Sequence, residues 1–438
     1  MKEVKDVVAM VIDNGIFVEI AVRLAREYKK VYYCVLGWPN SFPRMHEAWI
    51  GRGLENIEVV ESPWPYFNQI DLWVFPDVYF GEMQVWLESQ GKAVWGARMG
   101  EEMELYRDQM KRHMKALGLP VQPWIKIKGI TALREYLKTN NNKWVKINKW
   151  RGMMETFFSK DFKEVEPKLD ELAYQLGAFK NTMEFIVEDD LPDLVEVGLD
   201  AYTIDGKFPS QMMSGIEVKD KGYVGIFKQY KDLPAVITDF DKALAPTLKQ
   251  YGYRGFYSTE LRVGGDKKPV MIDMCARAGS PPSELYQENY KNLAEIIWAG
   301  GNGILIDPVP VAKFGAEMLI HSSWADKNWQ PVDFPPENRQ FIKLRNAAMV
   351  DGRYYVIPQA LGLPEIGAAV GYGDTLQAAI DMVKKIAKSV TGYFIDIFPD
   401  SLDEAEDEIA KSAKFGINYF DTKNEPENKP KDDLAQAA

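Results

Sequence analysis

Short apolar runs alternate with helix-like stretches over the first hundred residues. Val7–Ile12 is an apolar run typical of a buried strand, and Phe17–Tyr28 places Ile20 and Leu24 on one side of a predicted helix. Further strands are predicted at the apolar runs Lys30–Leu36, Ile57–Val60, Leu72–Phe75 and Ala93–Trp95. Because strands that alternate with helices usually form parallel sheets, this segment is predicted to be a parallel, Rossmann-like α/β domain.

A second pattern follows, in which helices and strands of mixed length succeed one another. Glu101–Leu117 has helical spacing and is followed by Gly118, which is typical of a helix end. Trp144–Ile147 and Thr156–Phe158 predict a hairpin-like pair of strands around the polar loop Asn148–Glu155. Other strands are predicted at Trp124–Ile127, Thr182–Val187, Glu196–Ile204, Gly222–Tyr230, Gly255–Val263 and Pro269–Met274, and helices at Thr131–Leu137, Val165–Leu176, Thr238–Tyr251 and Pro282–Trp298.

These patterns predict a multidomain chain. The predicted parts are 1–100 (parallel α/β), 101–308 (two subdomains), 309–422 (mixed α/β) and a tail, 423–438. Glu188–Asp193 is predicted to be an acidic linker, and Leu376–Val390 an amphipathic helix. The tail clusters Lys, Asp, Glu, Asn and Pro with almost no apolar residues, so it is predicted to be disordered.

Composition narrows the class of protein. The 438 residues are 46% hydrophobic and 27% charged, which is ordinary for a globular protein, and no apolar stretch approaches the roughly 18 residues of a membrane span. Two cysteines, Cys34 and Cys275, cannot form a disulfide framework, which favours the cytoplasm. The net charge of −11 argues against a nucleic-acid partner.

The scarcity of histidine limits the chemistry. His46, His113 and His321 are the only three, and their spacing matches no zinc motif. No G-x-S-x-G elbow accompanies them, so a serine triad is not indicated. Gly15 follows the first strand without a G-x-G-x-x-G fingerprint, so a dinucleotide-dependent enzyme is the weakest interpretation. The chemistry is therefore expected to use lysine, arginine, carboxylates and a metal.

Four segments occur in an order that suits a nucleotide. They are Tyr106–Lys111; Trp144–Ile147 with the loop after it; Met183–Val187; and Glu260–Arg262 with Ile272–Arg277. A triphosphate needs separated cations, which Lys111 and Lys146 would supply from two elements. Glu260 and Asp273 lie on consecutive predicted strands, and paired carboxylate oxygens suit Mg²⁺.

The same segments resemble the ATP-grasp superfamily, most of all phosphoribosylamine–glycine ligase, with biotin carboxylase and D-alanine–D-alanine ligase less similar. The resemblance covers roughly Val7 to Asp403. Gly252–Phe256 together with Asp273–Gly279 resembles the G-Y-R-G-F … E-F-N-A-R-F-G block of the superfamily. The resemblance implies an ATP-grasp fold with an N-terminal parallel α/β domain and a small C-terminal mixed domain.

The resemblance also implies roles for individual residues in binding ATP. Lys146 matches the phosphate-binding lysine of a V-V-K strand, and Lys111 or Arg107 occupies the place of an earlier phosphate lysine. The other nucleotide-binding residues that it implies are Lys149, Arg151 and Gly152 in a loop over the phosphates, Glu184 with the main chain of Phe185, Ile186 and Val187 at adenine, and Glu196 at ribose.

The metal site and the transferred phosphate are implied in the same way. Glu260 and Asp273 match the two metal-binding carboxylates, and Cys275 stands where the superfamily usually has Asn. Arg277 matches the arginine beside the transferred phosphate, so Arg277 and Lys146 are the expected catalytic residues. The implied cofactors are ATP and Mg²⁺.

The expected activity is ligation of a carboxylate to an amine through an acylphosphate, with release of ADP and an amino acid as one substrate. Small molecules are the expected partners, without a membrane, and a homodimer is compatible with the sequence. Lys146 also fits an edge-strand lysine that discourages aggregation, and Lys111 a solvated helix face. Cys275 and the single glycine of the loop, Gly152, favour the alternative of an ATP-binding regulatory or structural module.

Overall fold

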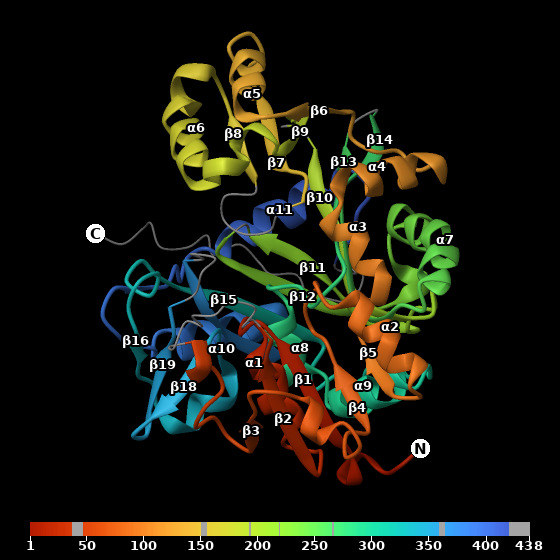
Figure 1. Cartoon of the computed structure of the whole chain (residues 1–438), viewed down its shortest axis with the longest axis vertical. Helices are drawn as coiled ribbons and strands as arrows, with labels where there is room; N and C mark the ends of the chain where they lie inside the picture. Colours follow the sequence, from red (N-terminus) through yellow and green to blue (C-terminus); the bar gives the residue numbers. More distant parts are fainter. Residues whose placement is uncertain are drawn as a thin grey trace, which may run out of the picture.

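The N-terminal part of the computed structural model is a parallel sheet (Figure 1), as predicted. Its strands lie in the order β3-β2-β1-β4-β5, and every neighbouring pair is parallel. The structure describes residues 1–36, 47–149, 156–191, 194–218, 220–264, 267–358 and 364–419. The elements are β1 (Val8–Asp13), α1 (Val18–Leu24), β2 (Lys30–Val35), β3 (Ile57–Val59), β4 (Leu72–Val74), α2 (Gly81–Ser89) and β5 (Ala93–Trp95).

A helix from much later in the chain covers part of this sheet. α9 (Leu293–Gly301) packs on β4 and β5. A Cβ atom on Gly300 would lie 2.5 Å from the Trp95 ring, so this close packing depends on glycine. The predicted single helix Pro282–Trp298 is instead α8 (Ser283–Asn289) followed by α9, because the Asn292 side chain between them bonds the main chain of residues 307 and 309.

The second layer is an antiparallel sheet in the order β6-β9-β7-β8, with α5 and α6 packed beside it (Figure 1). The predicted hairpin is present, and Lys146 pairs with Thr156 across it. The predicted linker is partly wrong, because Glu188 and Asp189 belong to β9. The elements are β6 (Trp124–Lys128), α5 (Ile130–Leu137), β7 (Lys143–Ile147), β8 (Thr156–Ser159), α6 (Phe162–Leu176) and β9 (Glu184–Asp189).

Two shorter helices replace the predicted helix Glu101–Leu117. α3 (Glu102–Leu105) and α4 (Arg107–Ala116) are separated at Tyr106, whose φ of −120° and ψ of 74° are not helical. The prediction of one helix is wrong because the backbone N–H groups at the start of α4 bond to Asn148 rather than continuing the first helix.

A three-stranded antiparallel sheet, β10-β13-β14, faces the second layer, and α7 packs on β10. In the first half of β10, Val195, Val197 and Leu199 are buried on one face, while the alternate positions Glu196, Gly198 and Asp200 are less buried. The elements are β10 (Val195–Ile204), α7 (Ala235–Gln250), β13 (Arg254–Gly264) and β14 (Lys267–Cys275).

The largest antiparallel sheet joins two distant parts of the sequence. Its order is β11-β12-β15-β20-β17, with β21 also paired to β15, and α10 packs on β20. β11 was not predicted. The elements are β11 (Gln211–Val218), β12 (Gly222–Gln229), β15 (Phe314–Ser322), β17 (Ile342–Leu344), β20 (Glu365–Gly373), α10 (Leu376–Ala387), β21 (Ile395–Asp396) and α11 (Asp403–Ala413), besides the small sheet β16 (Gln330–Val332), β19 (Arg353–Val356) and β18 (Ala347–Val350).

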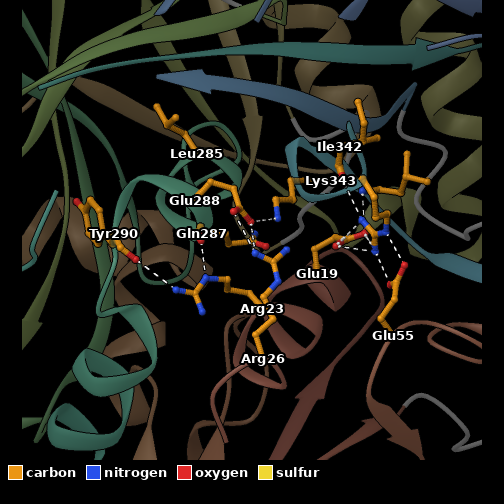
Figure 2. A network of polar contacts seen from close by, with 12 residues as sticks. Glu19, Arg23, Arg26, Glu55, Leu285, Gln287, Glu288, Tyr290, Ile342 and Lys343 are labelled. Carbon is orange, nitrogen blue, oxygen red and sulfur yellow. Dashed lines mark hydrogen bonds and ion pairs between the residues drawn. The ribbon is translucent and has the colours of Figure 1, made fainter. Parts of the chain in front are cut away.

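Ion pairs through Glu288 join α8 to Arg26, which follows α1, and to Lys343 of β17 (Figure 2). Glu288 of α8 accepts from Arg26 at 2.9 Å and from the buried Lys343 at 2.5 Å. Arg23 donates to the carbonyl of Gln287 at 2.6 Å. The N-terminal sheet therefore sits on the C-terminal half of the chain through a polar contact, in addition to α9.

Candidate nucleotide and ligation site

Two buried lysines from different elements meet at the junction of the second layer and the β10-β13-β14 sheet. Lys111 lies on α4 and forms an ion pair with Glu188 of β9. Lys146 lies on β7, and its Nζ is 3.5 Å from both Glu188 Oε2 and Asp273 Oδ2. The exposed fractions of Lys111, Lys146 and Glu188 are 1%, 5% and 4%, so this is not a solvated surface.

The charges of this cluster support one another. Burial opposes ionisation of Asp273, but Lys146, Arg107 and Lys111 outweigh it and lower the pKa of Asp273 to about 2. Burial also disfavours the charged form of Lys146, yet the carboxylates of Asp273 and Glu188 raise its pKa. Burial lowers the pKa of Lys111, and Glu188 partly offsets that effect. Lys111 of α4 and Lys146 of β7 are thus held close together by the same two carboxylates.

The start of α4 is fixed to the end of β7. Arg107 Nη1 donates to the carbonyl of Ile147 at 2.8 Å, and its Nε is 3.7 Å from Asp273 Oδ2. The N–H of Asp108 donates to Asn148 Oδ1 at 2.9 Å. Asn148 therefore acts as a cap that keeps α4, and with it Lys111, beside the strand that carries Lys146.

The predicted adenine-reading stretch lies inside a sheet. Asn148 donates to Glu184 at 2.9 Å and, with Lys126, lowers the pKa of Glu184. Phe185, Ile186 and Val187 are buried in β9, which pairs with β6 on one side and β7 on the other. A central strand uses its N–H and C=O groups on both neighbours, so the main chain here has no free edge for a base.

Carboxylates gather on the polar face of the β10-β13-β14 sheet. Glu260 and Asp273 are direct cross-strand partners, as their predicted hairpin requires. One oxygen from each of Glu196, Glu217 and Glu260 lies within 4.8 Å of the others. Glu196 also pairs with Arg262 at 2.7 Å. Glu196, expected at ribose, thus lies with the acidic group, and Glu217 joins it from the unpredicted strand β11.

Cys275 and Asp200 flank this acidic face. Burial raises the pKa of the Cys275 thiol well above its usual value, and sulfur is a soft ligand that suits Mg²⁺ poorly. Burial also raises the pKa of Asp200 to about 7, although the Ser258 hydroxyl donates to it at 2.8 Å. The oxygen donors that fit Mg²⁺ are therefore Glu260 with Asp273 or with the two other glutamates, without Cys275.

Arg277 is oriented by a residue that the sequence did not indicate. Its Nε donates to Glu104 Oε1 at 2.9 Å, and its Nη1 donates to the carbonyl of Ala278 at 2.9 Å. Glu104 Oε2 also accepts the N–H of Ala276 at 2.7 Å. Burial opposes the charge, but Glu104 raises the pKa of Arg277, which keeps the guanidinium positive.

The remaining predicted residues lie at the margin of the site. Lys149 is exposed, and its Nζ is 5.0 Å from the centre of the Tyr106 ring. Arg151 and Gly152 lie outside the described residues, as does the predicted disordered tail. The structure thus brings Lys111, Lys146, Arg107 and Asp273 together, and places Glu196 and Glu260 in a neighbouring acidic group.

The chain has the ATP-grasp fold, which comparison with solved structures shows. The sequence matches no protein-family model and no curated protein. The similar structures described below are enzymes, and they share 10–18% sequence identity with this chain. Within the described residues, no helix is long and apolar enough to cross a bilayer.

Three of these structures illustrate the likeness. Phosphoribosylamine–glycine ligase from Thermotoga maritima has a TM-score of 0.63 at 18% identity over 89% of this chain and 98% of that one. The biotin carboxylase domain of Hydrogenobacter thermophilus 2-oxoglutarate carboxylase is a dimer in complex with MgADP, ADP and bicarbonate. Its TM-score is also 0.63, with 10% sequence identity, and the match covers 93% of this chain and 95% of that one. N5-carboxyaminoimidazole ribonucleotide synthetase from Thermus thermophilus has a TM-score of 0.57 at 14% sequence identity, and the match covers 87% of this chain and 98% of that one.

Proposed function

We propose that this protein is an ATP-dependent, ADP-forming ligase that joins a carboxylate to an amine through an acylphosphate. The observation that carries the proposal is that Lys111, Lys146 and Arg107 meet at two carboxylates between two sheets, the buried Glu188 and the partly buried Asp273. Buried cations drawn from separate elements suit a polyanion such as a triphosphate. The ATP-grasp fold and its enzyme neighbours support the same class of reaction.

Lys111 and Lys146 would hold the phosphates of ATP. In this structure the ammonium groups of the two lysines form ion pairs with Glu188 and Asp273. The place of these carboxylates therefore shows where the lysines can stabilise negative charge. Glu184, Lys149 and the loop with Arg151 and Gly152 would complete the nucleotide site. In this proposal adenine contacts come from groups beyond the paired part of β9.

Mg²⁺ would be held by Glu260 with Asp273, or by Glu260 with Glu196 and Glu217. Both sets offer only carboxylate oxygens, which Mg²⁺ prefers. When bound, Mg²⁺ would offset the negative charge of the transferred phosphate. Glu260 belongs to both sets, so it is the residue on which metal binding should depend most.

Arg277 would stabilise the transferred phosphoryl group. A carboxylate oxygen of the acid forms a bond to the γ-phosphorus while the bond from that phosphorus to the bridging oxygen of ADP breaks. The amine nitrogen then bonds to the acyl carbon, the carbon–oxygen bond to phosphate breaks, and the nitrogen gives up a proton. Because Glu104 holds the guanidinium in one orientation, Arg277 can meet the developing charge without rearrangement.

Calorimetric titration of Mg²⁺–ATP into wild type and Lys146→Ala tests the proposal. A charge-assisted hydrogen bond contributes roughly 1.5–3 kcal/mol to binding. Because Lys146→Ala removes such a contact to ATP, the variant should bind ATP about ten- to a hundred-fold more weakly. Lys143→Ala, on the same strand but paired with the exposed Asp189, should bind ATP like wild type. ADP release that depends on one acid and one amine would establish ligation, while absence of ATP binding in wild type would refute it.

One set of observations favours the second candidate, a nucleotide-binding module without turnover. Asp273 is already engaged by Lys146 and Arg107, and Cys275 offers a sulfur ligand, which suits Mg²⁺ poorly. In that case ATP binds with the same dependence on Lys146, but no carboxylate or amine stimulates ADP release.

A further inference from the structure

Two buried carboxyl groups from different elements meet at the start of α8. Glu284 lies in the first turn of α8 and is 4% exposed, and Glu317 lies on β15 and is fully buried. Burial raises the pKa of Glu317 well above its usual value, and both the charge of Glu284 and a hydrogen bond between the two carboxyl groups add to that rise. At neutral pH the two groups therefore hold a proton between them.

Hydrogen bonds fix the orientation of this pair. The N–H of Leu285 donates to Glu317 Oε2 at 3.2 Å, and the Ser283 hydroxyl donates to Glu284 Oε2 at 3.2 Å. Glu317 Oε1 is buried and receives no hydrogen bond from the described residues. That arrangement suits an oxygen that carries the shared proton itself and donates it to Glu284.

The Ser280 hydroxyl connects Glu284 to a more accessible part of the structure. It donates to Glu284 Oε1, and Arg345 Nη2 donates to Ser280 Oγ at 2.6 Å. A hydroxyl oxygen has two acceptor positions, so Arg345 leaves one of them open as far as the described residues show. Ser280 is half-buried, whereas the two carboxyl groups behind it are buried. A substrate can therefore reach the pair through Ser280.

Ser280 belongs to the chain segment that carries Arg277, the residue proposed to stabilise the transferred phosphoryl group. A Cβ atom on Gly279 would lie 3.4 Å from Ser258 Oγ, and that hydroxyl donates to Asp200 at the flank of the acidic face. The N–H of Ser283 donates to the carbonyl of Gly279 at 2.8 Å, which ties the segment to the first turn of α8. Ser280 thus lies between the ligation site and Glu284.

The groups around the pair determine its charge. Arg345, which follows β17, has its Nε 3.8 Å from Glu284 Oε1 and its Nη1 3.6 Å from Glu365 Oε2 of β20. Its positive charge opposes the rise in the pKa of the second carboxyl group of the pair. The nearby hydroxyl groups are neutral, because burial raises the pKa of Tyr223 on β12 and of Tyr286 on α8. One arginine therefore faces three carboxyl groups, which fits one of them being protonated.

We propose that Ser280 and Glu284 form a proton relay that deprotonates the amine substrate of the ligase, with Glu317 as the protonated partner of Glu284. The ammonium group of the amine gives one proton to Ser280 Oγ while the hydroxyl proton of Ser280 passes to Glu284 Oε1. The neutral amine attacks the acyl carbon, and its next proton leaves with the phosphate as hydrogen phosphate. Glu284 then returns its proton to water through Ser280. The inference rests on the proposed function, because it assigns the base for that reaction.

The test compares two kinds of nucleophile with the full-length protein, Mg²⁺–ATP and a panel of carboxylic acids at pH 7. Hydroxylamine is already neutral at this pH, whereas ammonia, glycine, ethanolamine and putrescine are protonated. Glu284→Gln should slow amide formation from these basic amines at least about a hundredfold and leave hydroxamate formation within about twofold of wild type. The loss should shrink as the pH is raised to 9, because more of the amine is then neutral.

Variants of the serine keep the inference testable even if Glu284→Gln fails to fold. Ser280→Ala should slow amide formation about tenfold or more, again with normal hydroxamate formation. Ser280→Thr keeps a hydroxyl group and should restore most of the rate. Ser210→Ala is the matched control, because it removes a hydroxyl that donates to Asp307 just before β11, and it should match wild type with both kinds of nucleophile.

The outcomes separate the relay from ligation itself. Equal losses of amide and hydroxamate in Glu284→Gln and Ser280→Ala would show a merely structural role and overturn the relay. Unchanged amide formation in both variants, or hydroxamate without an amide from any basic amine in wild type, would overturn it as well. No hydroxamate from wild type with any acid would refute the proposed ligation, and the relay with it.

Discussion

Arg277 shows how one side chain can be prepared for a reaction by its neighbours. Its planar guanidinium is held by Glu104 on α3, and Glu104 in turn accepts the backbone N–H of Ala276. The orientation is therefore set by two elements that are far apart in the sequence. A lysine could keep the positive charge at this position but could not make the same fixed pair of contacts.

Arg277→Lys should lower the rate of ADP formation far more than it lowers ATP affinity. Loss of one preorganised contact to the transition state typically costs about a hundredfold or more in kcat. The measurement is steady-state ADP release with calorimetric ATP binding on the same sample. Arg254→Lys, whose arginine pairs with Asp205 away from the site, is the matched control. Weaker ATP binding with an unchanged kcat would show that Arg277 merely binds ground-state ATP.

The sequence identifies a candidate site residue only where it also predicts the strand that carries the residue. Lys146, Asp273 and Arg277 could be picked out because each lies on a recognisable apolar strand or directly after it. Glu188 was predicted as part of a linker because a run of acidic residues usually indicates a loop, yet it pairs with two buried lysines. Glu217 could not be identified because its strand was not predicted.

At the scale of elements, Asn148 links α4 to the second layer. It caps α4 through the N–H of Asp108 and bonds Glu184 of β9. This arrangement explains why the predicted helix is broken at Tyr106, since the first turn of α4 must turn toward the end of β7. Local propensity favours one continuous helix across this stretch, and only the tertiary contact shows the break.

Asn148→Ala should lower both the free energy of unfolding and ATP affinity. Loss of a cap costs about 1 kcal/mol, and Lys111 would lose its fixed position. Thr375→Ala removes the cap of α10, where the Thr375 hydroxyl accepts the N–H of Ala378. This control should lose similar stability in urea unfolding without weaker ATP binding. Equal effects of the two variants on ATP affinity would show that the Asn148 cap has no specific role.

The unpredicted strand β11 illustrates why sheet membership is hard to derive from sequence. Its residues, Gln211–Val218, include Met, Ser and Gly without clear alternation. Gly215 is nevertheless required there, because a Cβ would lie 2.2 Å from the carbonyl oxygen of Val224 on the paired strand. The strand forms because β12 pairs with it along its whole length, a contact that no local pattern contains.

At the scale of the whole molecule, the N-terminal sheet and the C-terminal half are joined by charged contacts. Glu55 lies just before β3, and its carboxylate accepts two hydrogen bonds from Arg339, at 2.8 and 2.9 Å. Arg339 also contacts Glu19 of α1. Glu19 in turn accepts the N–H of Leu344, so this junction holds β17 against α1.

The Glu55–Arg339 pair predicts a pH-dependent contribution to stability. Burial opposes the charge on Glu55, but Arg339 lowers the pKa of Glu55 to about 2. The folded-state pKa is below the unfolded value of about 4.3, so the stabilisation is present above about pH 4.3 and is lost as the pH falls toward 2. With a third of the Glu55 side chain exposed, the pair is worth about 1–2 kcal/mol after screening.

Urea unfolding of Glu55→Gln across this pH range measures that contribution. The variant should be less stable than wild type at pH 7, and the difference should shrink between about pH 4.3 and 2. Glu58→Gln, which removes the exposed pair with Lys30, should change the free energy of unfolding little at any pH. A pH-independent difference for Glu55→Gln would indicate lost packing rather than a lost ion pair.

Trapping the acylphosphate tests the central claim most directly. A panel of carboxylic acids is incubated with the protein, Mg²⁺–ATP and hydroxylamine, which converts an acylphosphate to a hydroxamate without the natural amine. The account predicts a hydroxamate from one class of acid, formed with one ADP per molecule, dependent on ATP and lost in Lys146→Ala but not in Lys143→Ala. Tight ATP binding with no hydroxamate and no ADP from any acid would contradict it and leave a nucleotide-binding module.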